Sequence, residues 1–411
     1  MDYGCIGEHL GHSFSRIIHS RIGRYDYELL ELAPKDLPSF LEHRDFRGIN
    51  VTIPYKQAVI PYLHDMSPRA RRIGAVNTII NREGRLYGDN TDFGGMQALL
   101  RKMGLDVSGG KALVLGSGGT SKTAAAVLES LGAGEIVRVS RSGKEGAVTY
   151  EQARSDHRDA RLIVNTTPCG MYPDIFGQPV GLDCFPALQG VADAIYNPLR
   201  SRLVLDARQR GLKAEGGLYM LVAQAVLAAE LFTDQPLPAG ETDRIYRQLL
   251  AEKENLVLIG MPGCGKTTVG RLLAGKLGRE LVDVDELIVR QAGCSISDIF
   301  AAEGEAAFRH LEAEIITGLS GVGGRVIATG GGAVLRRENV VNLSLNGRLI
   351  FLDRPPDQLT PTADRPLADA EDKIIRLYRE RYPVYRSAAD QTVKVEGTPE
   401  AVVKTILRSI T

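Results

Sequence analysis

The chain has 411 residues, of which 44% are hydrophobic and 24% charged, and its basic and acidic side chains balance at 50 each. That length suits two or three domains, and the even charge gives no electrostatic footprint for nucleic acid. The five cysteines show neither zinc-ligand spacing nor a disulfide framework, so we expect a reduced, cytoplasmic setting.

Strand-like runs alternate with helical stretches along the chain. In the first part the runs cover residues 111–116, 135–140, 161–167 and 191–196. Residues 219–232 (YMLVAQAVLAAELF) then predict a buried helix, too short and too polar to span a membrane. Further strands are expected at 255–260, 280–285, 325–329 and 348–353. This alternation favours an α/β protein with parallel sheets covered by helices.

Composition shifts divide the chain into unlike parts. The segment TDQPLPAG and the charged helical stretch after it indicate a linker at 233–254. Before it we expect a substrate-binding lobe at 1–100, to which helices of 218–250 return, and a Rossmann-like nucleotide lobe at 101–217. A separate P-loop domain is expected at 255–411. No repeat relates the two halves, which indicates a fusion.

The first glycine-rich loop is LVLGSGGTSKTA at 113–124. Gly116, Gly118 and Gly119 permit a tight turn and a close approach to a pyrophosphate, although Ser121 replaces the third glycine of the full pattern. A plain strand–helix turn stays open as the alternative. Arg141 follows the next strand, where an acidic residue would accept a ribose hydroxyl. An arginine there suits a 2′-phosphate, which favours NADP over NAD.

Upstream, a lysine and a carboxylate have the chemistry that a dehydrogenase needs. Lys56 follows a short strand and a proline turn, and Asp92 is expected on a loop bounded by glycines. Together they can share the proton that joins or leaves an oxygen as hydride moves. The hydroxyls of Ser13 and Ser15 can bind a carboxylate. Taken singly, the lysine is more typical of a surface position and the two serines of a solvated loop.

Motifs of this part occur in a family order. GxxHSxSxxxH, NVTxPxK, GAVNT, GDNTD, GxGG, NTTPxGM, DxxYxP and GGxxMLVxQA resemble shikimate dehydrogenase from residue 1 to about 250. The resemblance implies NADPH-dependent reduction of 3-dehydroshikimate, with Lys56 and Asp92 as the catalytic pair. Its implied substrate contacts are Ser13, Ser15, Thr52, Asn77, Asp92, Tyr196 and Gln224. Its implied NADP site comprises Gly116, Ser117, Gly118, Gly119, Thr120, Arg141, Thr166 and Gly217.

The second glycine-rich loop fits G-x-x-x-x-G-K-[ST] in full at residues 260–267, between a predicted strand and a predicted helix. Lys266 can pair with the β- and γ-phosphates, and Thr267 can bind Mg²⁺. Asp283 and Asp285 are expected to face one cleft from a strand end, where they suit Mg²⁺ or hydroxyls, or else are ordinary acids.

Later motifs in this part add candidate substrate contacts. Arg309, on a predicted helix, and Arg381 are candidates, although each could be a solvated surface arginine. Three glycines at 330–332 leave backbone N–H groups open to a ligand. The Pro- and Asp-rich segment 353–372, with Arg354 and Arg365, predicts a flap over phosphates.

GxxGxGKT, DVD, GExxFRxxE, TGGG, a late R-P and R-Y-P-x-Y together resemble shikimate kinase over nearly all of 255–411. The resemblance implies ATP-dependent phosphorylation of shikimate, with Asp285 helping to deprotonate the hydroxyl and Lys266 and Arg365 stabilising the transferred group. Its implied ATP contacts are Gly263, Cys264, Gly265, Lys266, Thr267, Thr268 and Arg365. Mg²⁺ is assigned to Thr267 and Asp283, and the substrate to Asp285, Arg309, Gly331 and Arg381.

These patterns predict a bifunctional enzyme that uses NADP(H), ATP and Mg²⁺ on small molecules, without nucleic acid or membrane. A ligand-sensing regulator and related chemistry on quinate or a gluconate-type substrate remain as alternatives. The oligomeric state stays open.

Overall fold

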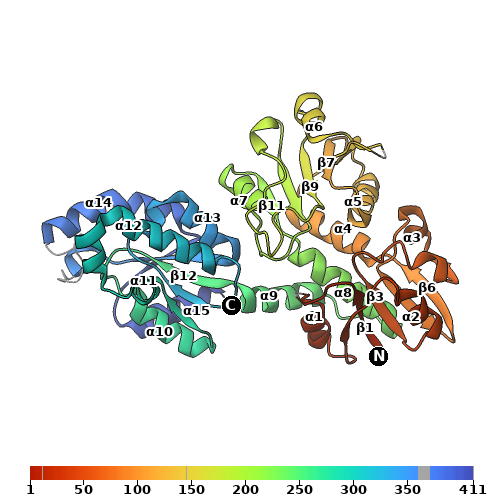
Figure 1. Ribbon diagram of the computed structural model, residues 1–411, viewed down its shortest axis with the longest axis horizontal. Coiled ribbons are helices and arrows are strands. Elements are labelled where there is room, and N and C mark those ends of the chain that lie inside the picture. Colours follow the sequence, from red (N-terminus) through yellow and green to blue (C-terminus); the bar gives the residue numbers. More distant parts are fainter. Residues whose placement is uncertain (12, 145, 360–370, 411) are drawn as a thin grey trace. The chain divides into compact units, whose positions relative to one another are not determined.

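The computed structural model describes residues 1–11, 13–144, 146–359 and 371–410. These residues form two compact units, Met1–Leu249 and Leu250–Thr411. Both units are α/β, as predicted, and Figure 1 shows each with its own sheets and helices. Within the described part of the chain, no helix is both long and apolar enough to cross a bilayer.

The first lobe of the N-terminal unit is built on a six-stranded sheet in the order β2-β1-β3-β5-β6-β4. Its elements are β1 (Tyr3–Gly7), α1 (Ser15–Ile22), β2 (Glu28–Glu31), α2 (Leu37–His43), β3 (Gly48–Val51), η1 (Ile60–Tyr62), β4 (Asp65–Met66), α3 (Pro68–Ile73), β5 (Thr78–Arg82) and β6 (Arg85–Asp89). Strands β3, β5 and β6 run antiparallel, unlike the parallel pairing that the alternation predicts. The reason is local, because Glu83 and Gly84 both take positive φ and close β5 and β6 into a hairpin.

The second lobe has a wholly parallel sheet in the order β11-β10-β9-β7-β8. Its elements are β7 (Lys111–Leu115), α5 (Gly119–Ser130), β8 (Glu135–Val139), α6 (Tyr150–Asp156), β9 (Leu162–Asn165), η2 (Leu182–Cys184), β10 (Gly190–Asp193), α7 (Arg202–Gln209) and β11 (Lys213–Glu215). The chain runs from β7 to β8 and then crosses to β9 on the other side of β7. Ligands of such sheets bind at this switch, outside the carboxyl ends of the strands.

Two helices connect the lobes. Helices α4 (Thr91–Met103) and α8 (Leu218–Thr233) pack against each other between the two sheets, as Figure 1 shows. Helix α8 is the predicted buried helix, and most of its residues are indeed buried. Helix α9 (Glu241–Lys253) follows and is polar, but Ile245 and Leu249 are buried.

The C-terminal unit has a parallel sheet in the order β13-β14-β12-β15-β16. Its elements are β12 (Asn255–Ile259), α10 (Lys266–Leu277), β13 (Leu281–Asp283), α11 (Val284–Ala292), α12 (Ile296–Leu319), β14 (Val326–Ala328), η3 (Ala333–Leu335), α13 (Arg337–Asn346), β15 (Gly347–Asp353), η4 (Pro356–Gln358), α14 (Glu371–Ala388), β16 (Gln391–Lys394) and α15 (Pro399–Ile410).

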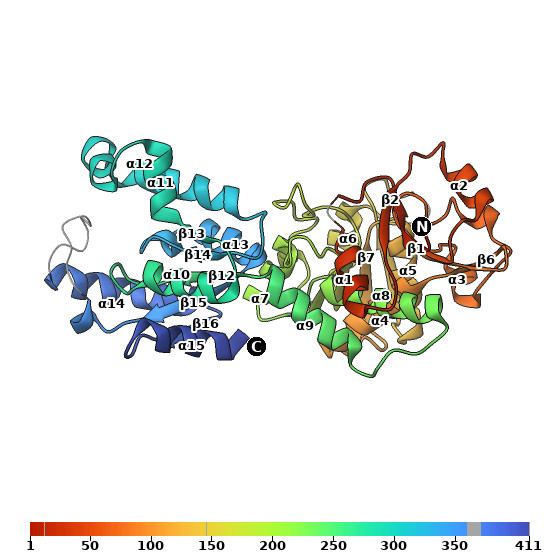
Figure 2. The same cartoon turned by 90° about the horizontal axis from the view of Figure 1, so that it is seen from below.

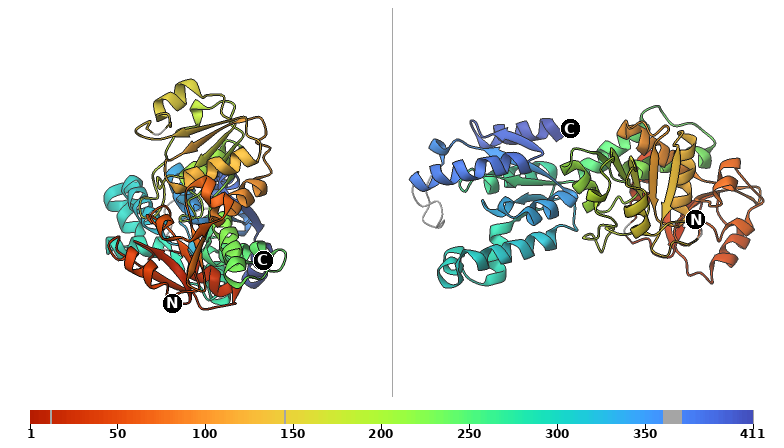
Figure 3. Two further views of the ribbon diagram at one scale, coloured as in Figure 1. Left: turned by 90° about the vertical axis from the view of Figure 1, so that its right-hand side faces the viewer. Right: turned by 90° about the horizontal axis from the view of Figure 1, so that it is seen from above.

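Helices cover both faces of this sheet. In Figure 2, α11 and the beginning of α12 project away from it, and Figure 3 shows the same feature from the opposite side. Gly304, with φ 81°, interrupts the regular helix inside α12. Ile296 and Phe300, at the beginning of α12, line a cavity that residues of the P-loop also line.

Candidate active sites

The predicted catalytic pair of the N-terminal unit is formed. Lys56 Nζ lies 2.5 Å from Asp92 Oδ2, and the two side chains are only 16% and 10% exposed. Asp92 was expected on a loop, and this is wrong, because it lies in the first turn of α4. The preceding Asn90 accepts a hydrogen bond from Phe93 N at 3.1 Å and so caps the helix. Because of this cap, the backbone of Asp92 is held in the first turn of a helix.

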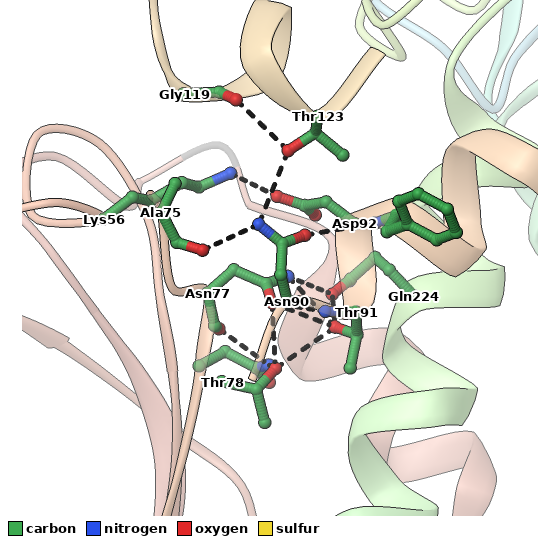
Figure 4. Close-up of polar contacts among 12 residues, drawn as sticks. Lys56, Ala75, Asn77, Thr78, Asn90, Thr91, Asp92, Gly119, Thr123 and Gln224 are labelled. Atoms are coloured by element: carbon green, nitrogen blue, oxygen red, sulfur yellow. Dashed lines mark hydrogen bonds and ion pairs between the residues drawn. The ribbon is translucent and has the colours of Figure 1, made fainter. Parts of the chain in front are cut away.

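A polar network surrounds this pair and ties it to both lobes (Figure 4). Asn77 Nδ2 donates to Thr91 Oγ1 at 3.0 Å, and Thr91 N donates to Asn77 Oδ1 at 2.7 Å. Gln224, from α8, accepts from both residues at 3.4–3.5 Å. Asn90 Nδ2 donates to Ala75 O at 2.9 Å and to Thr123 Oγ1, in α5, at 3.4 Å. The predicted contacts Asn77 and Gln224 are therefore brought beside Asp92.

The first glycine-rich loop lies close to Lys56. A Cβ on Gly119 would stand 3.7 Å from Lys56 Cδ, whereas a Cβ on Gly118 would meet nothing within 4 Å. Gly116 has φ 122°, and a Cβ there would stand 2.6 Å from Thr166 Oγ1. Thr166 itself donates to Leu115 O at 2.6 Å. The open backbone at the start of α5, together with Ser117 and Thr120, fits a bound pyrophosphate.

The remaining predicted NADP contacts lie at the same edge of the sheet. Arg141 is exposed two residues beyond the end of β8, as a contact to a 2′-phosphate would require. Gly217 precedes α8, and its N–H donates to Ile195 O at 2.7 Å. A Cβ on Gly217 would stand 2.2 Å from Ala194 O, so the close packing of these two loops needs glycine.

The predicted carboxylate-binding serines lie at the start of α1. Ser13 Oγ donates to Ser15 Oγ at 3.0 Å and accepts from Ser15 N at 3.2 Å. Phe14 lies between the two serines in sequence, and the centroid of its ring is 5.3 Å from that of the Tyr196 ring. Burial raises the pKa of Tyr196 to about 12, so its hydroxyl keeps its proton and can donate. Thr52 directly follows β3, on the way to Lys56.

The C-terminal unit encloses a cavity of about 560 Å³ at the carboxyl end of its sheet. Among the residues that line it are Gly263, Gly265, Lys266, Thr267, Thr268, Asp283, Asp285, Arg309, Gly331 and Arg381. Cys264 is fully buried beneath the loop. Lys266 donates to the carbonyls of Gly260 and Met261, each at 2.9 Å. Arg365 lies outside the described residues.

The two aspartates reach the cavity by a different route from the one expected. Strand β13 ends at Asp283, and Asp285 lies in the first turn of α11, so the prediction that both lie on one strand is wrong. Asp283 Oδ1 accepts from the backbone N–H of Asp285 at 3.0 Å and so starts the helix. Its other oxygen accepts from Thr267 Oγ1 at 2.7 Å. Two oxygen ligands of the kind that Mg²⁺ prefers therefore lie together.

A buried carboxylate supports Arg309. Glu312 is fully buried, and its Oε2 accepts from Arg309 NH1 at 2.8 Å. Burial raises the pKa of Glu312, and the negative charge of Asp285 adds to that rise, whereas Arg309 opposes it. A Cβ on Gly330 would stand 2.7 Å from Glu312 Oε1, and one on Gly332 would stand 2.2 Å from Arg309 NH2. A side chain at either position would therefore have to displace these charged groups from their present places.

Arg381 is buried, which excludes the alternative of a solvated surface arginine. Its NH1 donates to Gly331 O at 3.0 Å, and the hydroxyl of Tyr385 donates to the same carbonyl. The Tyr385 ring is fully buried and stacks on Phe351 with centroids 5.0 Å apart. Arg381 and Tyr385, one helical turn apart on α14, therefore both bind the carbonyl of Gly331, the middle glycine of residues 330–332.

Four residues of the two sites, Asn90, Thr91, Glu312 and Tyr385, were not predicted from the sequence, although each lies inside one of the family motifs. For the last two, helical spacing carries the missing signal. Glu312 is three residues after Arg309, and Tyr385 is four residues after Arg381, so each pair shares a helix face.

The fold and the two sites define a two-lobed dinucleotide-fold oxidoreductase followed by a P-loop phosphotransferase. Residues 5–79 match the family model of the shikimate dehydrogenase substrate binding domain, and residues 262–411 match that of shikimate kinase. A shikimate dehydrogenase (NADP(+)) of Moorella thermoacetica is 34% identical over 287 residues, which cover 64% of this chain and 96% of the relative.

Solved structures of shikimate dehydrogenases are similar to the N-terminal part of the chain. A shikimate dehydrogenase of Peptoclostridium difficile is 34% identical with a TM-score of 0.57, and the match covers 61% of this chain and 98% of that one. The shikimate 5-dehydrogenase of Thermus thermophilus, solved with NADP(H) and shikimate, is 33% identical with a TM-score of 0.54, covering 60% and 99%. The chain belongs to the shikimate dehydrogenase family and carries a shikimate kinase domain after it.

Proposed function

We propose that this chain reduces 3-dehydroshikimate to shikimate with NADPH in its N-terminal unit and phosphorylates the 3-hydroxyl of shikimate with ATP in its C-terminal unit. The observation that carries the proposal is the coexistence of two polar sites, the Lys56–Asp92 pair beside a dinucleotide loop and the P-loop cavity lined by Arg309 and Arg381. Family membership of both parts supports it.

In the N-terminal unit, the chain's own groups handle the proton. NADPH, when bound, supplies the hydride. Lys56 is a cation within hydrogen-bond reach of a carboxylate, so it can give a proton to the carbonyl oxygen of the substrate, and Asp92 stabilises the charged lysine. Asn77 and Gln224 present amides beside Asp92 for the ring hydroxyls, and Ser13 and Ser15 present hydroxyls for the carboxylate.

In the C-terminal unit, the chain positions an acceptor hydroxyl and neutralises charge. ATP with Mg²⁺, when bound, supplies an activated phosphoryl group. Asp285 lines the cavity and can accept the proton of the attacking hydroxyl. Arg309 and Arg381 line the same cavity and can hold the substrate carboxylate in a forked contact. Arg365, on the segment expected to close over the phosphates, is assigned to the transferred group.

The proposal also assigns the roles of the two lobes, the contact to the 2′-phosphate, the Mg²⁺ ligands and the cellular setting. The first lobe binds substrate and the second binds NADP, with Arg141 at its 2′-phosphate. Thr267 and Asp283 hold Mg²⁺, which their 2.7 Å contact supports. A cytoplasmic setting fits the five cysteines, all of which are free thiols.

A coupled assay tests the proposal. Purified protein is given 3-dehydroshikimate, NADPH, ATP and Mg²⁺, and shikimate 3-phosphate is the expected product. NADPH oxidation without any phosphorylated product would overturn the second activity. A protein that binds the ligands but turns over neither nucleotide would support a regulator instead. Quinate supplied with NADP⁺ in a parallel reaction measures the competing substrate.

A further inference from the structure

A second buried carboxylate in the N-terminal unit lies away from the Lys56–Asp92 pair. Asp193 is the last residue of β10, and its side chain is completely buried. Ser201 Oγ donates to its Oδ2 at 2.5 Å, and Asn165 Nδ2 and Ile195 N donate to its Oδ1 at 3.0 Å each. All these groups are donors, so they suit the ionised carboxylate.

The donors come from separate segments that meet at the crevice of the second lobe. Asn165 is the last residue of β9, and Ile195 is the second residue of the loop after β10. Ser201 caps α7 by accepting from Val204 N at 3.3 Å. Asn165 Oδ1 in turn accepts from the backbone N–H and the hydroxyl of Thr167, at 3.0 and 2.7 Å. Asp193 is therefore the centre of a network that fixes two loops and a helix.

Both loops carry proposed ligand contacts next to the anchored atoms. Thr166 lies between Asn165 and Thr167 and packs against Gly116 of the dinucleotide loop. Tyr196 follows Ile195 and faces Phe14 on the substrate side. Ile195 O also accepts from the N–H of Gly217. Moving Asp193 would therefore displace contacts to both ligands, because Thr166 directly follows the anchored Asn165 and Tyr196 directly follows the anchored Ile195.

Burying an ionised carboxylate costs desolvation free energy, so a buried charge that only connects two loops needs an explanation. Burial raises the pKa of Asp193 to about 6, although Ser201, Ile195 and Asn165 oppose the rise by hydrogen bonding. Its surroundings are an amide, a hydroxyl and a backbone N–H. The negative charge of Asp193 also acts on the nearby thiol of Cys169. Burial raises the pKa of this thiol, and the charges of Asp174 and Asp193 raise it further. An asparagine would have nearly the same shape, so shape alone does not account for a carboxylate here.

We propose that Asp193 is a positioning residue, whose negative charge holds the loops after β9 and β10 in the arrangement that binds NADPH. This inference rests on the proposed reductase function of the N-terminal unit. Because charge-assisted hydrogen bonds are about twice as strong as neutral ones, loss of the charge loosens the loops without unfolding the lobe.

The test compares wild type with Asp193→Asn in the full-length protein, with NADPH as the probe. At pH 7.5 we expect the Kd and KM for NADPH to rise at least fivefold, with a smaller change in kcat. Asp183→Asn is the matched control, because Asp183 is an exposed carboxylate of the same lobe, paired with Arg210. This control should bind NADPH like wild type.

A pH series separates positioning by charge from a merely structural role. The ratio of the Kd of Asp193→Asn to that of wild type should fall towards 1 between pH 7.5 and pH 5, because wild type loses the same charge by protonation. Titration of the nucleotide's own phosphate cancels in this ratio. A ratio of 1 throughout, or an elevated ratio that does not change with pH, would overturn the inference.

Ser201→Ala gives an independent readout if the first variant folds poorly. Removing this donor raises the pKa of Asp193, so NADPH binding should begin to weaken at a higher pH than in wild type. An unmoved midpoint would overturn the proposal. Wild type that binds no NADPH at all would overturn the proposed function and this inference with it, an outcome distinct from equal binding by wild type and Asp193→Asn.

Discussion

Lys56 is largely shielded from solvent in the folded unit. It is 16% exposed, contacts Asp92, and lies beside the backbone of Gly119 at the start of α5. A lysine in this position is reachable by a ligand but shielded from bulk solvent, which strengthens its interaction with a carbonyl oxygen. The pair is therefore suited to proton transfer and not to surface charge.

Replacing Lys56 with Gln should lower kcat for reduction by roughly 10²- to 10⁴-fold, the usual contribution of a general acid. Phosphorylation by the same protein should be unchanged. Spectrophotometry of NADPH oxidation and a separate kinase assay measure the two rates. The control is Lys102→Gln, which removes an ion pair with Glu215 outside the site. Equal losses in both variants would refute the assigned role.

His19 is a buried histidine that makes stability depend on pH. Its ring stacks on Tyr27 at 3.8 Å, and its Nδ1 is 2.8 Å from the Tyr25 hydroxyl. Burial lowers its pKa to about 3, so the folded unit keeps it neutral while an unfolded chain protonates it below about 6.5. The unfolded state thus binds more protons between these values, and acid destabilises the fold.

His19 should therefore reduce the free energy of unfolding by about 1.4 kcal/mol for each unit of pH lost between pH 6 and pH 4. Asp193 acts in the opposite sense over this range, because its folded-state pKa is raised, so the comparison must be between variants. His19→Asn should lack the His19 component of the slope. Amide hydrogen exchange of β1 and β3 reports this unit, and identical slopes in both proteins would contradict the expectation.

At the scale of elements, helix caps place the two predicted catalytic aspartates. Asn90 starts α4 and Asp283 starts α11, and each cap places an aspartate, Asp92 or Asp285, in the first helical turn. The sequence pattern predicts a loop and a strand at these positions. The two capping hydrogen bonds are worth about 1 kcal/mol each, which is enough to select the helical alternative over a few residues.

Helix α14 and the glycine loop after β14 are coupled through one carbonyl. Tyr385→Phe keeps the ring that stacks on Phe351 but removes the hydroxyl that donates to Gly331 O. Loss of one hydrogen bond of about 1 kcal/mol should raise the KM for shikimate about fivefold, with kcat less affected. Tyr382→Phe, on the same helix, is the control and should leave KM unchanged. Steady-state kinetics decide, and equal effects would argue against this coupling.

At the scale of the whole molecule, the chain carries two units with separate cores. The proposed Mg²⁺ ligands Thr267 and Asp283 belong to the C-terminal unit alone. Nothing in the proposed chemistry of the Lys56–Asp92 site requires a divalent ion. The two activities should therefore respond independently to metal removal.

Treatment with EDTA should abolish phosphorylation and leave reduction of 3-dehydroshikimate unchanged, and excess Mg²⁺ should restore the kinase. Parallel assays of NADPH oxidation and ADP release measure this. Thr267→Ser, which keeps a hydroxyl at the metal position, should retain much more kinase activity than Thr267→Val. Loss of reduction in EDTA would contradict the assignment of the metal to one unit.

The sequence by itself determined what is local. The P-loop is a run of consecutive residues whose glycines and Lys-Thr pair specify their own conformation, so residues 260–267 were assigned without any tertiary contact. The order of motifs likewise identified both families. The tertiary structure decided what depends on distant partners: that Gln224 meets Asn77, that Glu312 supports Arg309 against Gly330, and that Asp193 joins two loops and a helix. Such contacts join residues brought together only by sheet order and burial, whose energies no short stretch of sequence contains.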